Sequence, residues 1–216
     1  MPPKGRGKYL GFVAHEIKNP LATALWSCDL LKRMEGAERS GERAEKMIDV
    51  SLRALRRMRR LIDDYFMLER LAEDGYELKR ERISLKTLVD SALGALSEKD
   101  RIPTAGWALE VGEGELTGDL EMLKRAVRCA VEHMARAIPP PRITLASRQS
   151  EQGVELLIRA DPPPPQIVPP EPEERQSGDP SGSVLGFALA ARILAAQRGR
   201  FEERDGALAM IFGKAG

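Results

Sequence analysis

Apolar residues recur every three or four positions along residues 8–35 and again along residues 42–73. This spacing places them on one face of an α-helix, so each segment is predicted to form a long amphipathic helix. The first stripe contains Leu10, Val13, Ile17, Leu21, Ala24, Cys28 and Leu31. The second contains Met47, Val50 or Ser51, Leu55, Met58, Ile62, Tyr65, Leu68 and Leu71.

Residues 36–41 begin and end with glycine and are predicted to form the turn between the two helices. Helices joined by so short a turn form an antiparallel hairpin. Because two helices alone cannot enclose a core, we expect a second copy of the hairpin to pair with the first. The chain is therefore predicted to be a homodimer held by a four-helix bundle.

Beyond residue 75 the pattern changes to shorter helices mixed with strands. Helical spacing covers residues 83–96, 119–138 and 184–198, with Ser84 and Asp119 as N-terminal capping residues. Strands are predicted at residues 107–111, 115–117, 142–148, 154–159, 200–203 and 207–212. Residues 162–181 are rich in proline and are predicted to be a loop. The predicted fold class is α+β, with a hairpin domain at 1–75 and an α/β sandwich at 76–216.

Composition narrows the class of protein. The chain has 216 residues, of which 42% are hydrophobic, enough to form a core, and its net charge of +1 gives no basic surface for nucleic acid. No apolar run approaches the roughly 20 residues of a membrane span, and the N-terminus lacks a signal peptide's hydrophobic centre. The two cysteines, Cys28 and Cys129, suit a reducing compartment. We expect a cytoplasmic protein without nucleic-acid or membrane partners.

One of the two histidines has a distinctive position. At 100° per residue, His15 falls about 160° away from the stripe that contains Leu10 and Ile17, so it is predicted to face solvent. Asn19, one helical turn further on, shares that face and rules out a His-Glu-x-x-His zinc site. Trp26 is predicted on the same exposed side. It is either part of a docking surface or packed against the C-terminal domain or the partner hairpin.

Residues 15–21, His-Glu-Ile-Lys-Asn-Pro-Leu, resemble the phosphoacceptor box of two-component histidine kinases. The likeness continues through residues 30–31, 59–64, 68 and 71 and is typical of the dimerisation and phosphoacceptor domain. It implies that His15 is the phosphorylated nucleophile, that Glu16 accepts or orients its proton, and that Asn19 positions water for dephosphorylation of a receiver. It also implies that a response-regulator receiver docks on Phe12, Ala22 and Trp26. The alternative is that Glu16 and Asn19 are ordinary solvated helix surface.

Residues 80–214 resemble the Bergerat-type ATP-binding domain of the same kinases, chiefly at residues 116–119 and 182–192, but the nucleotide motifs are altered. Two asparagine positions near Mg²⁺ in the family are Cys129 and His133 here, and neither side chain suits that hard cation. The aspartate expected at adenine, Asp161, is followed by four prolines that supply no N–H group.

The last glycine box keeps only Gly182 and Gly186. We therefore expect a degenerate ATP site in which Asp161 and these two glycines are vestigial and no cofactor or metal is bound. The alternative is a divergent site that still binds nucleotide weakly through other ligands.

A phosphorylatable hairpin before a degenerate ATP domain, with no sensor domain ahead of it, resembles the dimeric histidine phosphotransferases of bacterial phosphorelays. We therefore expect His15 to carry phosphoryl groups to and from receiver aspartates, with Mg²⁺ supplied by the receiver and an upstream histidine kinase as a further partner. Two alternatives stay open. One is a sensor histidine kinase core that autophosphorylates His15 with ATP, and the other is a non-catalytic pseudokinase scaffold that binds a kinase or a receiver.

Overall fold

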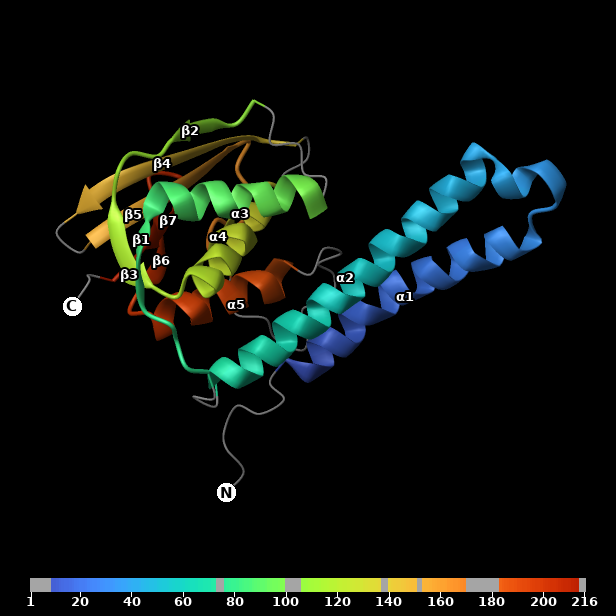
Figure 1. Cartoon of the computed structure of the whole chain (residues 1–216), viewed down its shortest axis with the longest axis horizontal. Coiled ribbons are helices and arrows are strands. Elements are labelled where there is room, and N and C mark those ends of the chain that lie inside the picture. Colours follow the sequence, from blue (N-terminus) through green and yellow to red (C-terminus); the bar gives the residue numbers. More distant parts are fainter. Residues whose placement is uncertain are drawn as a thin grey trace, which may run out of the picture. The chain divides into compact units, whose positions relative to one another are not determined.

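The computed structural model describes residues 9–72, 76–99, 106–136, 140–150, 153–169 and 183–213. It contains two compact units, of which the first includes the helical hairpin up to Glu69, and the second begins at Arg70 and includes the sheet (Figure 1). The α+β fold class predicted from the sequence is confirmed.

The hairpin consists of two long helices, α1 (Leu10–Arg33) and α2 (Glu42–Ala72), joined by a 3₁₀ helix at Gly36–Ser40. Both helices lie within two residues of their predicted bounds. Gly36 has a φ of +53°, a conformation that glycine adopts without the steric cost of a Cβ atom. Apolar side chains from both helices are buried, among them Val13, Ala24, Ala54, Met58, Leu61 and Leu68.

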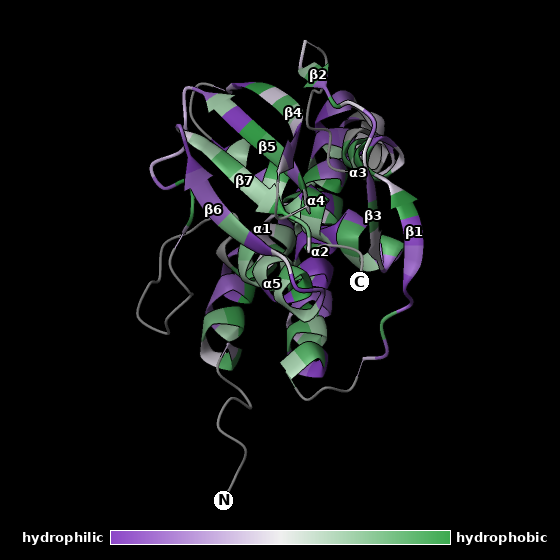
Figure 2. Ribbon diagram, turned by 90° about the vertical axis from the view of Figure 1, so that its left-hand side faces the viewer, coloured by the Kyte–Doolittle hydropathy of each residue, from purple (hydrophilic) through white to green (hydrophobic). Residues whose placement is uncertain are grey.

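The sheet domain begins with β1 (Glu81–Ser84), α3 (Leu85–Lys99), β2 (Ala108–Glu110), β3 (Glu115–Gly118) and α4 (Leu120–Met134). It continues with β4 (Arg142–Ser150), β5 (Gly153–Asp161), α5 (Ser183–Ala196), β6 (Arg200–Arg204) and β7 (Ala207–Ile211). Five strands form one sheet in the order β2-β4-β5-β7-β6, and β1 pairs with β3 in a separate two-stranded sheet. The helices α3, α4 and α5 cover one face of the larger sheet (Figures 1 and 2).

The register of the central strands brings apolar side chains into line. Leu145 pairs with Ile158, which in turn pairs with Leu208, and all three side chains are fully buried. All five residues of β7 are buried, whereas the edge strand β6 is mostly hydrophilic (Figure 2). The domain therefore encloses a core within a single chain.

Two local features differ from, or refine, the sequence prediction. Ile83 was predicted to start a helix with Ser84 as its cap, but both residues lie in β1, and α3 begins at Leu85. The reason is tertiary, because Ile83 pairs with Leu116 of β3 and both side chains are buried. The other predicted cap is confirmed, since the side chain of Asp119 accepts a hydrogen bond of 3.1 Å from the Met122 amide.

Candidate functional site

His15 lies in the second turn of α1, and its side chain is 49% exposed, as the helical periodicity predicted. Its Nδ1 atom lies 3.6 Å from Oε1 of Glu16, which is ion-pair range but too long for a hydrogen bond. The carboxylate therefore stands on the Nδ1 side of the ring. The other ring nitrogen, Nε2, is the one that can act as a nucleophile while Nδ1 holds the proton.

Glu16 is buried, with 1% of its side chain exposed, although it follows directly after the exposed His15. Its carboxylate takes part in an ion pair across the hairpin, in which Nη2 of Arg57 on α2 lies 3.4 Å from Oε2 of Glu16. A buried carboxylate needs a cation or hydrogen-bond donors to offset its lost hydration, and Arg57 supplies them. The interpretation of Glu16 as ordinary solvated surface is therefore wrong.

Three further residues of the predicted site lie on the exposed surface of α1. Asn19 and Ala22 are exposed, and the side chain of Trp26 is 59% exposed. The backbone at Asn19 is tied to the next turn, because the hydroxyl of Thr23 donates a 3.1 Å hydrogen bond to the Asn19 carbonyl. The surface at His15 is therefore flanked by one amide, one small residue and one large aromatic side chain.

Phe12 does not belong to that surface, contrary to the docking prediction, because only 4% of it is exposed. Residues four apart share a helix face, so Phe12 lies on the side of α1 that also carries Glu16. Its position around the helix is intermediate between Trp26 and Glu16, and the sequence prediction grouped it with the wrong one of the two.

Pro20 lies inside α1 and is buried. Because proline has no amide hydrogen, it cannot donate to the carbonyl four residues earlier, which belongs to Glu16. The helical hydrogen-bond ladder is therefore interrupted in the turn that carries the His15 and Glu16 side chains, while α1 continues to Arg33.

In the sheet domain, the altered nucleotide motif lies in a packed interior. His133 on α4 is 7% exposed, and its Nε2 atom lies 2.9 Å from the carbonyl oxygen of Gln166 in the segment after β5. The His133 ring packs against Phe187 of α5 with ring centroids 5.0 Å apart, and Phe187 packs against Phe201 of β6 at 4.7 Å. His133 thus contacts α5 and the segment after β5, and Phe187 extends this packing to β6.

The remaining nucleotide-motif residues are spread over separate elements. Cys129 is buried, and a Cβ atom added to Gly186 of α5 would stand 3.5 Å from its sulfur, so Gly186 packs closely against α4. Asp161 is exposed at the end of β5. Gly182 lies outside the described residues, as do residues 170–181 of the predicted proline-rich loop. Residues 162–169 form neither helix nor strand.

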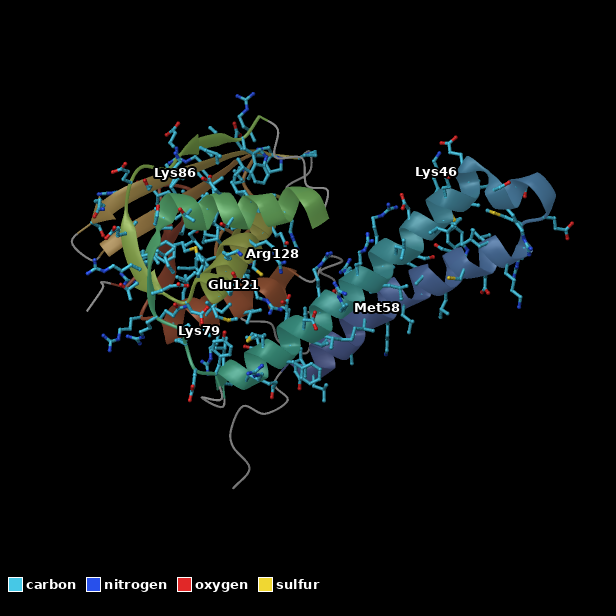
Figure 3. The ribbon with its side chains drawn as sticks, in the orientation of Figure 1. Lys46, Met58, Lys79, Lys86, Glu121 and Arg128 are labelled. Carbon is cyan, nitrogen blue, oxygen red and sulfur yellow. The ribbon has the colours of Figure 1, made fainter. Side chains whose placement is uncertain are left out.

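Asp119 organises the start of α4. Its Oδ2 atom accepts a hydrogen bond of 3.0 Å from the amide of Lys79, which lies in the segment that follows α2 and is labelled in Figure 3. The same oxygen accepts one of 3.4 Å from the hydroxyl of Tyr76. Burial, together with the negative charge of Asp119, raises the pKa of Tyr76 above its usual value. The guanidinium of Arg70 lies over the Tyr76 ring at 5.6 Å. These contacts tie the segment after α2 to the start of α4.

Within the described residues, no cluster of three or more His, Cys, Asp or Glu side chains is arranged to hold a metal ion. None of the helices in that part of the chain combines the length and the hydropathy that a membrane span requires.

The fold and the site define a class of protein: an α-helical hairpin that presents a histidine beside a buried glutamate, followed by a separate α/β sheet domain. Residues 6–74 match the family model described as the His Kinase A (phospho-acceptor) domain. The N-terminal part of the chain is such a domain, and the chain as a whole has the organisation of a histidine kinase core.

Two curated relatives match over much of the chain. The sensor protein SphS of Synechococcus elongatus is 26% identical over 220 residues, which cover 93% of this chain and 51% of SphS. The sensor protein DivL of Caulobacter vibrioides is 26% identical over 153 residues, or 69% of this chain and 20% of DivL. The chain thus spans about half of the first relative and a fifth of the second.

Two solved structures share the fold. Histidine kinase AdeS of Acinetobacter baumannii superposes with a TM-score of 0.66 at 16% identity, covering 94% of this chain and 98% of the AdeS chain. Histidine kinase ThkA, solved in complex with the response regulator protein TrrA, has a TM-score of 0.61 at 20% identity, covering 95% of this chain and 60% of the ThkA chain.

These comparisons contradict the prediction of a dimeric histidine phosphotransferase, because the relatives are sensor proteins and the matched structures are histidine kinases. The prediction gave weight to the altered nucleotide motifs and to the lack of a sensor domain ahead of the hairpin. The lack of a sensor domain carries no weight, since the chain spans only half the length of SphS.

Sequence reasoning missed Arg57. It lies 41 residues from Glu16, among several arginines of α2. The signal was available in the hairpin prediction, because residues at similar distances from the turn face each other in an antiparallel pair. A glutamate next to an exposed histidine, opposite an arginine, is the pattern to look for.

Proposed function

We propose that this chain is the core of a two-component sensor histidine kinase and that His15 is the residue that becomes phosphorylated. The observation that carries the proposal is the half-exposed imidazole whose Nδ1 atom faces a buried carboxylate, within a His Kinase A domain. Neutral imidazole is a good nucleophile near pH 7, and the arrangement supports attack by Nε2.

The carboxylate of Glu16 has a defined role in this chemistry. As the Nε2 lone pair forms a bond to phosphorus, the bond from phosphorus to its leaving oxygen breaks and the ring becomes positively charged. Glu16 stabilises that charge and holds or accepts the Nδ1 proton. Asn19, exposed one turn further on, is proposed to position water when the phosphoryl group of a receiver is hydrolysed.

The assembly that we propose is a homodimer. Large apolar side chains remain exposed along one side of both helices of the hairpin, and a four-helix bundle with a second copy would bury them. They are Leu10, Leu21 and Leu25 on α1 and Ile48, Leu52, Leu55, Ile62 and Phe66 on α2.

The proposed partner is a response-regulator receiver, docked on the exposed surface around His15, Asn19, Ala22 and Trp26. An exposed aromatic side chain near a reactive histidine is typical of an interface anchor. The receiver would supply its own Mg²⁺. The histidine kinase ThkA was solved in complex with a response regulator protein, and this complex supports the proposed partner by analogy.

A specific observation favours a second candidate function. The residues at the expected magnesium position do not fit Mg²⁺, which takes oxygen ligands, because they are a buried thiol and an imidazole already bonded to the Gln166 carbonyl. This mismatch supports a member of the kinase family that has lost ATP turnover and binds a kinase or a receiver as a scaffold.

One experiment separates the two candidates. The purified chain and its His15→Ala variant are incubated with γ-labelled ATP and Mg²⁺, and acid-labile label is measured, with Trp26→Ala as a variant that keeps the nucleophile. Label on the wild type and on Trp26→Ala, but not on His15→Ala, supports the kinase. A folded dimer that takes up no label in any variant overturns it and leaves the scaffold.

A further inference from the structure

Arg57 connects the two helices of the hairpin at the reactive histidine. Its Nη2 atom lies 3.4 Å from Oε2 of Glu16, while the other oxygen of the same carboxylate, Oε1, lies 3.6 Å from Nδ1 of His15. The three side chains therefore form a line from α2 to the exposed ring, with each carboxylate oxygen facing a different nitrogen group. The chemistry proposed above uses His15 and Glu16 and assigns nothing to Arg57.

Because Glu16 is buried, its contact with Arg57 has a strong influence on the orientation of the carboxylate. An exposed carboxylate rotates freely and is screened by water, but the side chain of Glu16 is 1% exposed and that of Arg57 is 26% exposed. In such surroundings a charge-assisted contact between guanidinium and carboxylate is strong and directional. Arg57 is therefore placed to fix which oxygen of Glu16 is turned toward His15.

We propose that Arg57 is a positioning residue for phosphorylation of His15, an inference that rests on the proposed function of His15 as the phosphoacceptor. Arg57 holds the Glu16 carboxylate on the Nδ1 side of the ring, where its negative charge favours the proton on Nδ1 and leaves the lone pair on Nε2. Without Arg57, Glu16 turns or takes up a proton. The ring then loses its preferred tautomer, and Nε2 becomes a poorer nucleophile.

A purely structural role would be different. If the ion pair only held α1 and α2 together, its loss would lower the stability of the hairpin and leave the ring of His15 unchanged. The test therefore needs a signal from the ring itself and a rate that does not depend on the sheet domain. The chain has only two histidines, which makes both measurements clean.

The variants are Arg57→Gln, which removes the charge, Arg57→Lys, which restores it, and Arg56→Gln as a matched control at an exposed neighbour on α2. The first measurement is the ¹⁵N NMR signature of the His15 tautomer in the full-length chain, assigned by comparison with His15→Ala. The second is the rate at which phosphoramidate phosphorylates His15. In that reaction Nε2 attacks phosphorus, the P–N bond of the reagent breaks, and ammonia leaves with the electron pair.

We expect the wild type and Arg56→Gln to show the Nδ1–H tautomer and equal rates. Arg57→Gln is expected to lose that tautomer and to react at least about tenfold more slowly, since a positioned acid or base contributes on the order of 10²- to 10⁴-fold. Arg57→Lys is expected to recover at least about half of the wild-type rate, because the charge is retained.

The proposal is wrong if folded Arg57→Gln keeps the wild-type tautomer and rate, or if folded Arg57→Lys is as slow as Arg57→Gln. If Arg57→Gln does not fold, as circular dichroism would reveal, folded Arg57→Lys is compared with the wild type instead, and a rate below about half of the wild-type rate or a lost Nδ1–H tautomer overturns the proposal. Phosphoramidate needs no nucleotide site. If Arg57→Gln slows phosphorylation by phosphoramidate but ATP labels none of the variants, only the proposal of kinase activity is overturned.

Discussion

The hairpin and the sheet domain differ in how far their large apolar side chains are buried. Within the described residues, nine of the eleven large hydrophobic side chains that remain exposed belong to the hairpin, with Phe66 at 60% and Trp26 at 59%. In the sheet domain, large side chains such as Leu145, Leu156 and Ile158 are fully buried. The sheet domain therefore has a complete core within one chain, whereas the hairpin needs a partner to cover its surface.

The polar side chains of the candidate sites in the two regions also differ in their exposure. The hairpin keeps the half-exposed His15 at its surface, beside an ion pair of the buried Glu16 with the partly exposed Arg57. In the sheet domain, the corresponding motif positions are filled by packing, since His133 is bonded to the backbone of Gln166 and stacked on Phe187. The candidate site of the hairpin thus lies at exposed positions, whereas His133 and Cys129 of the sheet domain are buried.

The largest expected effect concerns the core of the sheet domain. Leu156→Ala on β5 should lower the free energy of unfolding by about 2–5 kcal/mol, because it leaves a cavity among fully buried neighbours. Leu109→Ala on β2, where the side chain is 52% exposed, should change it by no more than about 0.5 kcal/mol. Urea denaturation of both variants checks this, and equal losses would mean that the core has been placed wrongly.

The next largest effect is expected on the stability of the proposed homodimer, from a change on the exposed apolar side of the hairpin. Leu55→Asp should raise the dissociation constant of the homodimer at least about a hundredfold, since each buried leucine contributes about 1.5–3 kcal/mol and both copies lose one. Arg53→Asp, on the opposite side of α2, is the control and should leave the dimer intact. Sedimentation equilibrium gives the constants. A wild-type chain that sediments as a monomer would refute the proposed bundle.

A smaller loss is expected at the junction that precedes α4. Asp119→Ala removes the helix cap and the acceptor for the Lys79 amide, which should cost about 1–3 kcal/mol of unfolding free energy. Asp119→Asn keeps an oxygen acceptor and should lose less. Thermal unfolding with amide hydrogen exchange of residues 76–80 checks both points. Unchanged exchange in Asp119→Ala would show that this contact does not hold the segment.

The smallest effect is a pH dependence at alkaline pH. The pKa of Tyr76 is raised in the folded chain by burial and by Asp119, relative to the ordinary value of 10.0. The unfolded chain therefore loses the phenol proton first, so stability should fall as pH rises from about 10 toward the folded pKa. Phenolate absorbance should show a phase that titrates late, and Tyr76→Phe should abolish that phase.

Local periodicity was enough to predict most elements of this fold. Both hairpin helices were anticipated from their helical spacing, and the strands of the larger sheet from short apolar or alternating runs bounded by turn residues. Strand β1 was missed, since its four residues are too short to show a period and Ile83 is buried only by pairing with Leu116.

For the candidate site, too, some features could be predicted from local sequence and others could not. The exposure of His15 follows from its angle around one helix, and that angle depends on local geometry alone. The burial of Phe12 and the pairing of Glu16 with Arg57 depend on how a second helix packs against the first. An angle on a single helix cannot reveal which neighbouring positions the other helix covers.

The amino-acid sequence by itself therefore determined the two-part organisation, the long helices and the surface histidine, because these follow from the spacing of apolar residues along the chain. Only the tertiary structure decided that Arg57 neutralises the carboxylate beside that histidine and that His133 belongs to a packed interior. Both are contacts between residues that are distant in the chain, and their existence depends on the three-dimensional packing of separate elements.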